Sequence, residues 1–209
     1  MHVVSLVTQK GGTGKSSLVI SLAVAAQERG QKVYVIDLDP QGTAKNWYER
    51  REAEWPEVAT LEASRLPHAI ETLRKLGTDI VFIDTPGIDV PAATAAMQAS
   101  DLCLIPARPS IADIEATKPT VRSLARLGKS FAFVLNQCPP GRSIRTSDAY
   151  RVLQLSGAVA GATTHLRDPA DQVAAGAEHD RDLRGWRRHP DHVPAGRHAH
   201  PGRRRGGDR

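Results

Sequence analysis

Short, predominantly apolar runs recur through the first 135 residues of the chain. They have the length of strands, show no regular polar alternation, and occupy residues 3–7, 33–36, 80–83, 102–105 and 131–135. A strand that is apolar on both faces is typical of a parallel sheet covered by helices on both sides. The pattern therefore predicts five buried strands of a mostly parallel sheet.

Between these runs, apolar residues recur at the spacing of a helix. The expected helices span residues 16–29, 43 to about 52, 67–76, about 92–99 and 114–127. Gly30, Gly77 and Gly128 follow three of them and are typical helix stops. Strands that alternate with helices predict an α/β, doubly wound fold, in which ligands bind at the carboxyl ends of the strands.

Composition narrows the class of protein. The 209 residues suit one α/β domain. Cys103 and Cys138 lie far apart and form no metal-type pair, which favours a reduced, cytoplasmic setting. The chain starts with strand-like residues, without a leader, and no apolar run approaches the roughly 18 residues that a membrane span requires. The net charge of +5 permits a polyanionic partner without requiring one.

The first predicted strand is followed by a glycine-rich loop, KGGTGKS at residues 10–16, and then by a helix. Glycines allow backbone N–H groups to turn inward around phosphate oxygens, and the start of the helix adds its positive dipole end. Lys15 can reach the β- and γ-phosphates of a nucleotide, and the Ser16 hydroxyl can ligate Mg²⁺. The order of strand, loop and helix therefore predicts a P-loop that binds ATP and Mg²⁺. The residues expected to bind the nucleotide are Gly11, Gly12, Thr13, Gly14, Lys15, Ser16 and Ser17.

Carboxylates follow two of the predicted strands. Asp37 and Asp39 come after the second strand, and Asp84 ends the third. All should project into the mouth that holds the glycine-rich loop, where phosphoryl transfer needs a positioned water and a held Mg²⁺. Asp84 is expected to support Mg²⁺ through a water, and residues 85–87 to begin a switch segment. The plainer alternatives are a solvated Asp-Pro turn at residues 39–40 and a simple strand-end cap at Asp84.

The spacing of the loop departs from the common pattern G-x-x-x-x-G-K-[ST], because Gln9 stands at the first glycine and Lys10 opens the glycine run. QKGGTGKS at residues 9–16 resembles the signature of the ParA/MinD ATPases, closest to small ParA-type plasmid and chromosome partition proteins. The resemblance implies that Lys10 crosses a dimer interface to the partner's phosphates, so that two ATP molecules are sandwiched between two subunits. Lys10, Lys15 and Asp39 are then the catalytic residues.

The resemblance also implies roles for residues outside the loop. In VIDLDPQG at residues 35–42, Asp39 orients the attacking water and Asp37 supports the water shell of the metal. The metal residues are then Ser16, Asp37 and Asp84. Asn136, just after the fifth strand, matches the position whose amide reads adenine, and Pro106 lies in a stretch that resembles one near the nucleotide and the dimer surface. A turn role explains Pro106 and Asn136 equally well.

The family resemblance implies an ATP-dependent DNA-partitioning ATPase with weak basal activity. Mg-ATP drives homodimerisation and nonspecific DNA binding, and a ParB-like, centromere-binding partner stimulates hydrolysis and release. We expect the protein to be cytoplasmic, nucleoid-associated and not bound to a membrane. We expect neither the metal-cluster cysteines of nitrogenase iron proteins, nor the membrane helix of MinD-type proteins, nor the helix-turn-helix of larger partition ATPases. An ATPase that positions a protein cargo, a truncated non-hydrolysing remnant, and a metabolic P-loop enzyme such as an amidoligase or kinase stay open.

The resemblance covers about residues 2–155, so we expect the chain to consist of three segments. After this ATPase domain at residues 1–155, residues 156–183 match the family poorly, and residues 184–209 form a basic tail that we expect to be disordered. From Ser156 onward there are 10 arginines, no lysines and 7 acidic residues. One interpretation is a basic arm that contacts DNA phosphates. The other is a shift of reading frame near residues 155–165, which predicts a family-like C-terminus in another frame of the gene.

Overall fold

A sheet of parallel strands organises the part of the chain that the computed structural model describes, which is residues 1–51, 53, 55–87, 90–141 and 143–160. The strands are β1 (His2–Leu6), β2 (Val33–Asp37), β3 (Glu57–Thr60), β4 (Ile80–Asp84), β5 (Leu102–Ala107), β6 (Phe131–Leu135) and β7 (Ala158–Val159). Their order is β3-β2-β4-β1-β5-β6-β7, and all pairs among the described strands are parallel. The parallel sheet expected from the sequence is confirmed.

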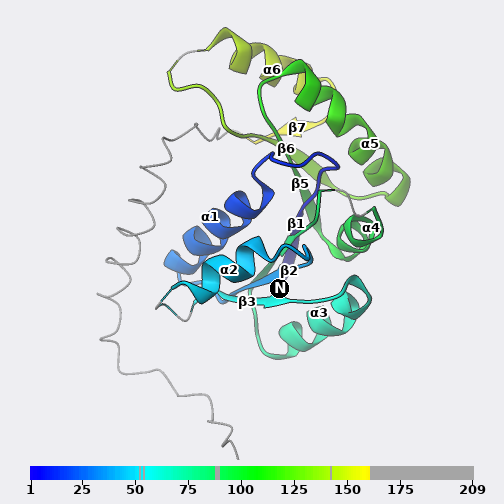
Figure 1. The fold of residues 1–209 in the computed structure, drawn as a ribbon. Coiled ribbons are helices and arrows are strands. Elements are labelled where there is room, and N and C mark those ends of the chain that lie inside the picture. Colours follow the sequence, from blue (N-terminus) through cyan, green and yellow to red (C-terminus); the bar gives the residue numbers. More distant parts are fainter. Residues whose placement is uncertain (52, 54, 88–89, 142, 161–209) are drawn as a thin grey trace, which may run out of the picture.

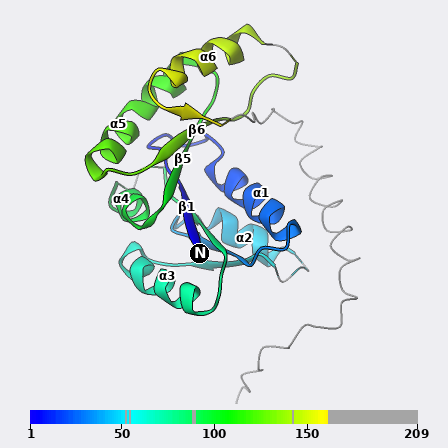
Figure 2. The same ribbon diagram turned by 180° about the vertical axis from the view of Figure 1, so that it is seen from behind.

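Helices cover both faces of this sheet (Figure 1). They are α1 (Lys15–Glu28), α2 (Thr43–Glu49), α3 (Leu66–Lys75), α4 (Val90–Ala99), α5 (Ile111–Leu127) and α6 (Ile144–Gln154), and a 3₁₀ turn, Ala63–Arg65, leads into α3. α1 and α2 lie on one face, whereas α3, α4 and α5 lie on the other, and the reverse view in Figure 2 shows the same division. α6 packs with α5 against β6. This is the doubly wound α/β fold predicted from the sequence.

The central strand, β1, is buried on both sides. Val4 and Leu6 pack with α1, while Val3 and Val7 belong to the clusters on the opposite face. Because β1 lies between β4 and β5, its carboxyl end opens at the middle of one edge of the sheet. The glycine-rich loop therefore starts where the loops from neighbouring strands converge.

The structure adds elements that the sequence pattern did not predict. The strands β3 and β7 and the helix α6 are additional, and β7 continues the sheet beyond residue 155. α5 begins at Ile111 rather than at residue 114, because Ser110 caps it. α2 ends at Glu49, short of the predicted residue 52.

Residues 161–209, which include the predicted basic tail, lie outside the described residues. Both interpretations of that segment therefore stay predictions. Within the described part of the chain, no helix is both long enough and apolar enough to cross a membrane.

Candidate functional site

The glycine-rich loop connects β1 to α1 and is drawn in dark blue in Figure 1. Gly12 and Gly14 have φ angles of 72° and 84°, in the left-handed region that favours glycine. Gly14 is also the residue at which α1 begins, and its carbonyl accepts the N–H of Leu18 at 3.0 Å. The N–H groups of the first turn have no capping side chain, so they remain available to an anion.

Asn136 packs directly on this loop from the end of β6. Its Nδ2 donates to the carbonyl of Thr13 at 2.7 Å, and its Oδ1 accepts the N–H of Gln137 at 2.9 Å. Gln137 has a φ of 54° and places its own Nε2 at 3.5 Å from the carbonyl of Gly12. The amide expected to read adenine thus braces the phosphate loop, and its contact with a base stays a prediction.

The close approach of Asn136 to Gly14 gives a testable expectation. A Cβ on Gly14 would lie 2.2 Å from Nδ2 of Asn136, whereas a Cβ on Gly30, at a similar φ of 81°, would meet nothing within 4 Å. We expect Gly30→Ala to cost about 1 kcal/mol through backbone strain alone. Gly14→Ala should cost about 2–3 kcal/mol, because it must also displace the amide. Urea unfolding of the nucleotide-free protein measures both, and equal costs would contradict the bracing role of Asn136.

Lys15 lies under the segment that follows β4. It is buried, and a Cβ built on Gly87 would lie 3.6 Å from Lys15 Nζ and 3.3 Å from the backbone of Gly11. Thr85 fixes the same segment, because its Oγ1 donates to the carbonyl of Leu6 at 2.6 Å. Burial lowers the pKa of Lys15, and the charges of Asp84 and Asp39 oppose that change. The expected switch segment, residues 85–87, therefore packs against the phosphate loop.

Asp84 ends β4 beside Asp37 of β2, and the two residues are register partners. Both carboxylate oxygens of Asp84 are buried, and neither accepts a backbone N–H group of the described residues. Burial raises the pKa of Asp84 to about 7, which the Ser16 hydroxyl opposes and the charge of Asp37 reinforces. A buried carboxylate that no backbone donor satisfies fits a bound cation.

Mg²⁺ fits this position by its chemistry. No group of three or more His, Cys, Asp or Glu residues in the described part of the chain could hold a metal by itself. Mg²⁺ in nucleotide sites takes one or two protein oxygens and fills its remaining positions with phosphates and water. Asp84 and the Ser16 hydroxyl supply such oxygens beside the phosphate loop.

The carboxylate of Asp37 is occupied differently. Its oxygens accept the backbone N–H groups of Asp39 at 3.0 Å, Ala44 at 3.1 Å and Lys45 at 3.1 Å. Burial raises its pKa, and these hydrogen bonds oppose the rise. Asp39 itself is half-buried and accepts the N–H of Gln41 at 2.9 Å through Oδ1.

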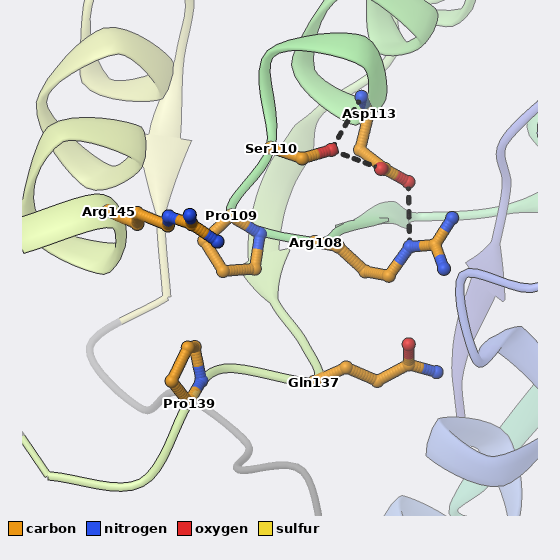
Figure 3. Close-up of a pocket in the computed structure, with 7 residues that line it drawn as sticks. All are labelled: Arg108, Pro109, Ser110, Asp113, Gln137, Pro139 and Arg145. Carbon is orange, nitrogen blue, oxygen red and sulfur yellow. Dashed lines mark hydrogen bonds and ion pairs between the residues drawn. The ribbon is translucent and has the colours of Figure 1, made fainter. Parts of the chain in front are cut away.

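Lys10 turns away from its own loop toward the start of α5. Its Nζ lies 3.1 Å from Oδ2 of Asp113, whose Oδ1 accepts Nε of Arg108 at 3.0 Å. The Ser110 hydroxyl also donates to Asp113, and Ser110 Oγ in turn accepts the N–H of Asp113 at 3.2 Å (Figure 3). Burial raises the pKa of Asp113, but the hydrogen bonds from Ser110, Arg108 and Lys10 outweigh it and lower that pKa.

Sequence reasoning did not single out Asp113 as a partner of Lys10. The pattern Ser110-x-x-Asp113 is a helix-start signature and would have indicated the cap. The pairing with Lys10 has no sequence signal, because it joins the loop after β1 to the first turn of α5.

A hollow opens beside this cluster, between the starts of α5 and α6 (Figure 3). It has a volume of about 330 Å³ and is lined by Arg108, Pro109, Ser110, Asp113, Gln137, Pro139 and Arg145. Pro106 is not part of it, because it is buried within β5 opposite Val134 of β6. Lys10, Lys15, Asp39, Asp84 and Asn136 all stand at the same edge of the sheet, as the sequence predicted.

Comparison with known proteins supports the same interpretation. Residues 4–167 match the CobQ/CobB/MinD/ParA nucleotide-binding domain. The chain is 32% identical over 159 residues to the maintenance of carboxysome distribution protein A of Gloeobacter kilaueensis, covering 75% of this chain and 72% of that protein. It is 29% identical over 155 residues to the chromosome-partitioning ATPase Soj of Thermus thermophilus, covering 57% of this chain and 62% of that protein.

A solved structure shares the fold. The septum site-determining protein MinD from Pyrococcus horikoshii, complexed with Mg-ADP, superposes with a TM-score of 0.62 at 22% identity, covering 85% of this chain and 86% of that chain. At this identity the likeness supports the fold alone. The family match over most of the chain carries the classification, and it agrees with the loop spacing and the sheet order. The chain therefore belongs to the CobQ/CobB/MinD/ParA nucleotide-binding domain family, and within it to the ParA/MinD group.

Proposed function

We propose that this protein is an ATPase that binds Mg-ATP, dimerises around two nucleotides, and partitions DNA along the nucleoid in the cytoplasm. The observation that carries the proposal is Lys10. Lys15 already stands inside the loop for the phosphates of its own nucleotide, whereas Lys10 Nζ points outward to Asp113. A second lysine that is directed away from its own phosphate loop supports the proposal that it reaches the phosphates of another subunit.

The proposed mechanism assigns a task to each group. The backbone N–H groups of residues 11–14 bind phosphate oxygens, and Lys15 neutralises charge on the β- and γ-phosphates. Asp39 orients a water in line with the γ-phosphate, so that hydrolysis gives ADP and phosphate. Ser16 and Asp84 would hold Mg²⁺, which supplies charge neutralisation on the phosphate oxygens when it is bound.

DNA as the cargo is supported by relatives such as the chromosome-partitioning ATPase Soj. In this proposal the ATP-bound dimer binds DNA nonspecifically, and a ParB-like partner stimulates hydrolysis and release. A second candidate cargo is a protein assembly, because another relative is named for the maintenance of carboxysome distribution. A neighbouring gene for a small DNA-binding protein with upstream repeats would favour DNA, whereas a neighbouring gene for an assembly component would favour the second cargo.

Dimerisation is tested by Lys10→Ala. With Mg²⁺ and a non-hydrolysable ATP analogue, we expect the wild-type protein to double its mass in size-exclusion chromatography with light scattering. Lys10→Ala should stay monomeric while it still binds the analogue, because the contact across the interface is lost and Lys15 stays in place. The pair of Lys10 with Asp113 is lost as well, but Asp113 keeps its contacts with Arg108 and Ser110. Lys118→Ala is the control, since Lys118 makes an exposed pair with Glu115 on α5.

Either of two results would contradict this part of the proposal. A wild-type protein that stays monomeric with saturating analogue would favour the non-hydrolysing remnant. A Lys10→Ala protein that dimerises as the wild type does would show that Lys10 is not the residue that bridges the subunits.

A further inference from the structure

The carboxylate of Asp37 is completely buried at the carboxyl end of β2, with an exposed fraction of 0%. Its Oδ1 accepts the N–H of Asp39, and its Oδ2 accepts the N–H groups of both Ala44 and Lys45. Both oxygens are therefore engaged by backbone donors. A buried carboxylate is stabilised by such donors, and losing them would leave it unpaired at a high cost.

These hydrogen bonds close a loop over Asp37. α2 begins after Gly42, which has a φ of 62° and no side chain that could cap the helix. The N–H groups of the first turn have no acceptor within the helix, and Asp37, from the preceding strand, supplies one to Ala44 and Lys45. Within the loop, the N–H of Gly42 bonds to the carbonyl of Asp39 at 2.8 Å, so the turn that carries Asp39 is fixed at both ends.

Asp84 offers a direct contrast on the neighbouring strand. It is the register partner of Asp37 and is equally buried, but neither of its carboxylate oxygens accepts a backbone N–H group of the described residues. Three of the roughly four acceptor positions of the Asp37 carboxylate are taken by backbone N–H groups, so little of it remains for a metal's water shell. The Asp84 carboxylate holds no backbone N–H group from the described part of the chain. The two carboxylates are therefore equipped for different tasks.

We propose that Asp37 is a positioning residue, which fixes the Asp39 turn and the start of α2 through three backbone N–H groups instead of serving the metal. Only the expected effect on kcat rests on the proposed ATPase function; the positioning role itself rests on the hydrogen bonds. Asp39 must hold its water in line with the γ-phosphate, and a displacement of about 1 Å in such a group costs up to about 100-fold in rate.

Asp37→Asn tests this role, because the amide keeps the shape of the side chain but sets an N–H group against N–H groups. In the nucleotide-free protein, we expect hydrogen exchange at Ala44 and Lys45 to become at least about 10-fold faster. The kcat for ATP should fall by about 10- to 100-fold. The KM for ATP and the Mg²⁺ concentration for half-maximal nucleotide binding should stay within about twofold of wild type.

Asp101→Asn is the matched control. Asp101 also accepts a backbone N–H, that of Val3 at 2.8 Å, but at the opposite end of the sheet. It should change neither kcat nor exchange in α2. Unchanged exchange at Ala44 and Lys45 in Asp37→Asn, or a loss of Mg²⁺ affinity that matches the loss of kcat, would overturn the proposal.

A second measurement needs no variant and serves if Asp37→Asn does not fold. In the wild-type protein with a non-hydrolysable ATP analogue, exchange at Ala44 and Lys45 should not accelerate when Mg²⁺ is added. Faster exchange would mean that the carboxylate leaves α2 for the metal, which contradicts the proposal. If the wild-type protein fails to hydrolyse ATP, the proposed function fails, while the exchange and Mg²⁺ measurements still decide the role of Asp37.

Discussion

Replacing Lys15 with alanine should weaken ATP binding by about 100-fold, which corresponds to about 3 kcal/mol. Lys15 is the buried lysine of the phosphate loop. Burial lowers its pKa, and the negative charges of Asp84 and Asp39 oppose that change and favour the charged form. Alanine removes the charge-assisted hydrogen bonds to the phosphates and leaves the backbone N–H groups of the loop in place. Fluorescence titration with a labelled ATP measures the dissociation constant in the presence of Mg²⁺.

The control for this variant is Lys129→Ala. Lys129 Nζ bonds to the carbonyls of Gln98 and Ser100, away from the phosphate loop, so its loss should leave ATP affinity within about twofold of wild type. Circular dichroism would check that both variants are folded. An unchanged ATP affinity in a folded Lys15→Ala protein would refute the assignment of residues 10–16 as the nucleotide loop.

The central strands and their loops could be predicted because the pattern of neighbouring residues along the chain is enough to identify them. A continuous apolar run such as residues 80–83 forms a strand that is buried on both faces of the sheet. The aspartate that follows this run therefore lies at the edge of the sheet formed by the carboxyl ends of the strands. The glycine-rich loop is also local, since strand, glycines and helix follow one another. The sequence therefore predicted the position of Lys15, Asp37 and Asp84 at one edge of the sheet.

The elements at the borders of the sheet have weaker local signals. In β3, Val58 is the one residue of the strand that is buried, and β7 has two residues. In α6, the buried residues are Ala149 and Leu153, too few for a clear helical stripe. These elements are stabilised by the strands and helices beside them in the fold. Those contacts are not visible in the pattern of residues along the chain.

The partners of the site residues could not be predicted for the same reason. Asn136 meets Thr13 across 123 positions of sequence, and Lys10 meets Asp113 from the loop of another strand. The positions of Lys10 and Asn136 just after predicted strands indicated that both would lie near the nucleotide. Which group each side chain contacts depends on how β1, β5 and β6 are aligned in the sheet, and only the folded chain determines that alignment.

Replacing Asp84 with asparagine should stabilise the nucleotide-free protein and weaken its response to Mg²⁺. The pKa of Asp84 is raised to about 7. Between about pH 4 and pH 7 the folded state therefore holds a proton that the unfolded state has lost, so the free energy of unfolding falls as the pH rises. Asparagine carries no charge at any of these pH values. The variant should lose this decline, which amounts to at most about 4 kcal/mol for a pKa raised from 3.8 to about 7, and should therefore be more stable than the wild type at pH 7.5.

Asp84→Asn should increase stability and weaken the response to Mg²⁺, whereas general damage to the fold would lower stability. With ATP present, Mg²⁺ should raise the melting temperature of the wild type much more than that of Asp84→Asn, because the variant lacks the ionised oxygen that the cation needs. Asp79→Asn is the control: its carboxylate accepts the N–H of Lys32 at 2.8 Å, so its loss should destabilise the protein modestly and leave the Mg²⁺ response intact. Urea unfolding from pH 4.5 to 7.5 and thermal unfolding with and without Mg²⁺ measure both effects. A variant that is less stable than wild type at pH 7.5, or that responds fully to Mg²⁺, would show that Asp84 is a structural strand-end residue instead of the carboxylate that holds the cation.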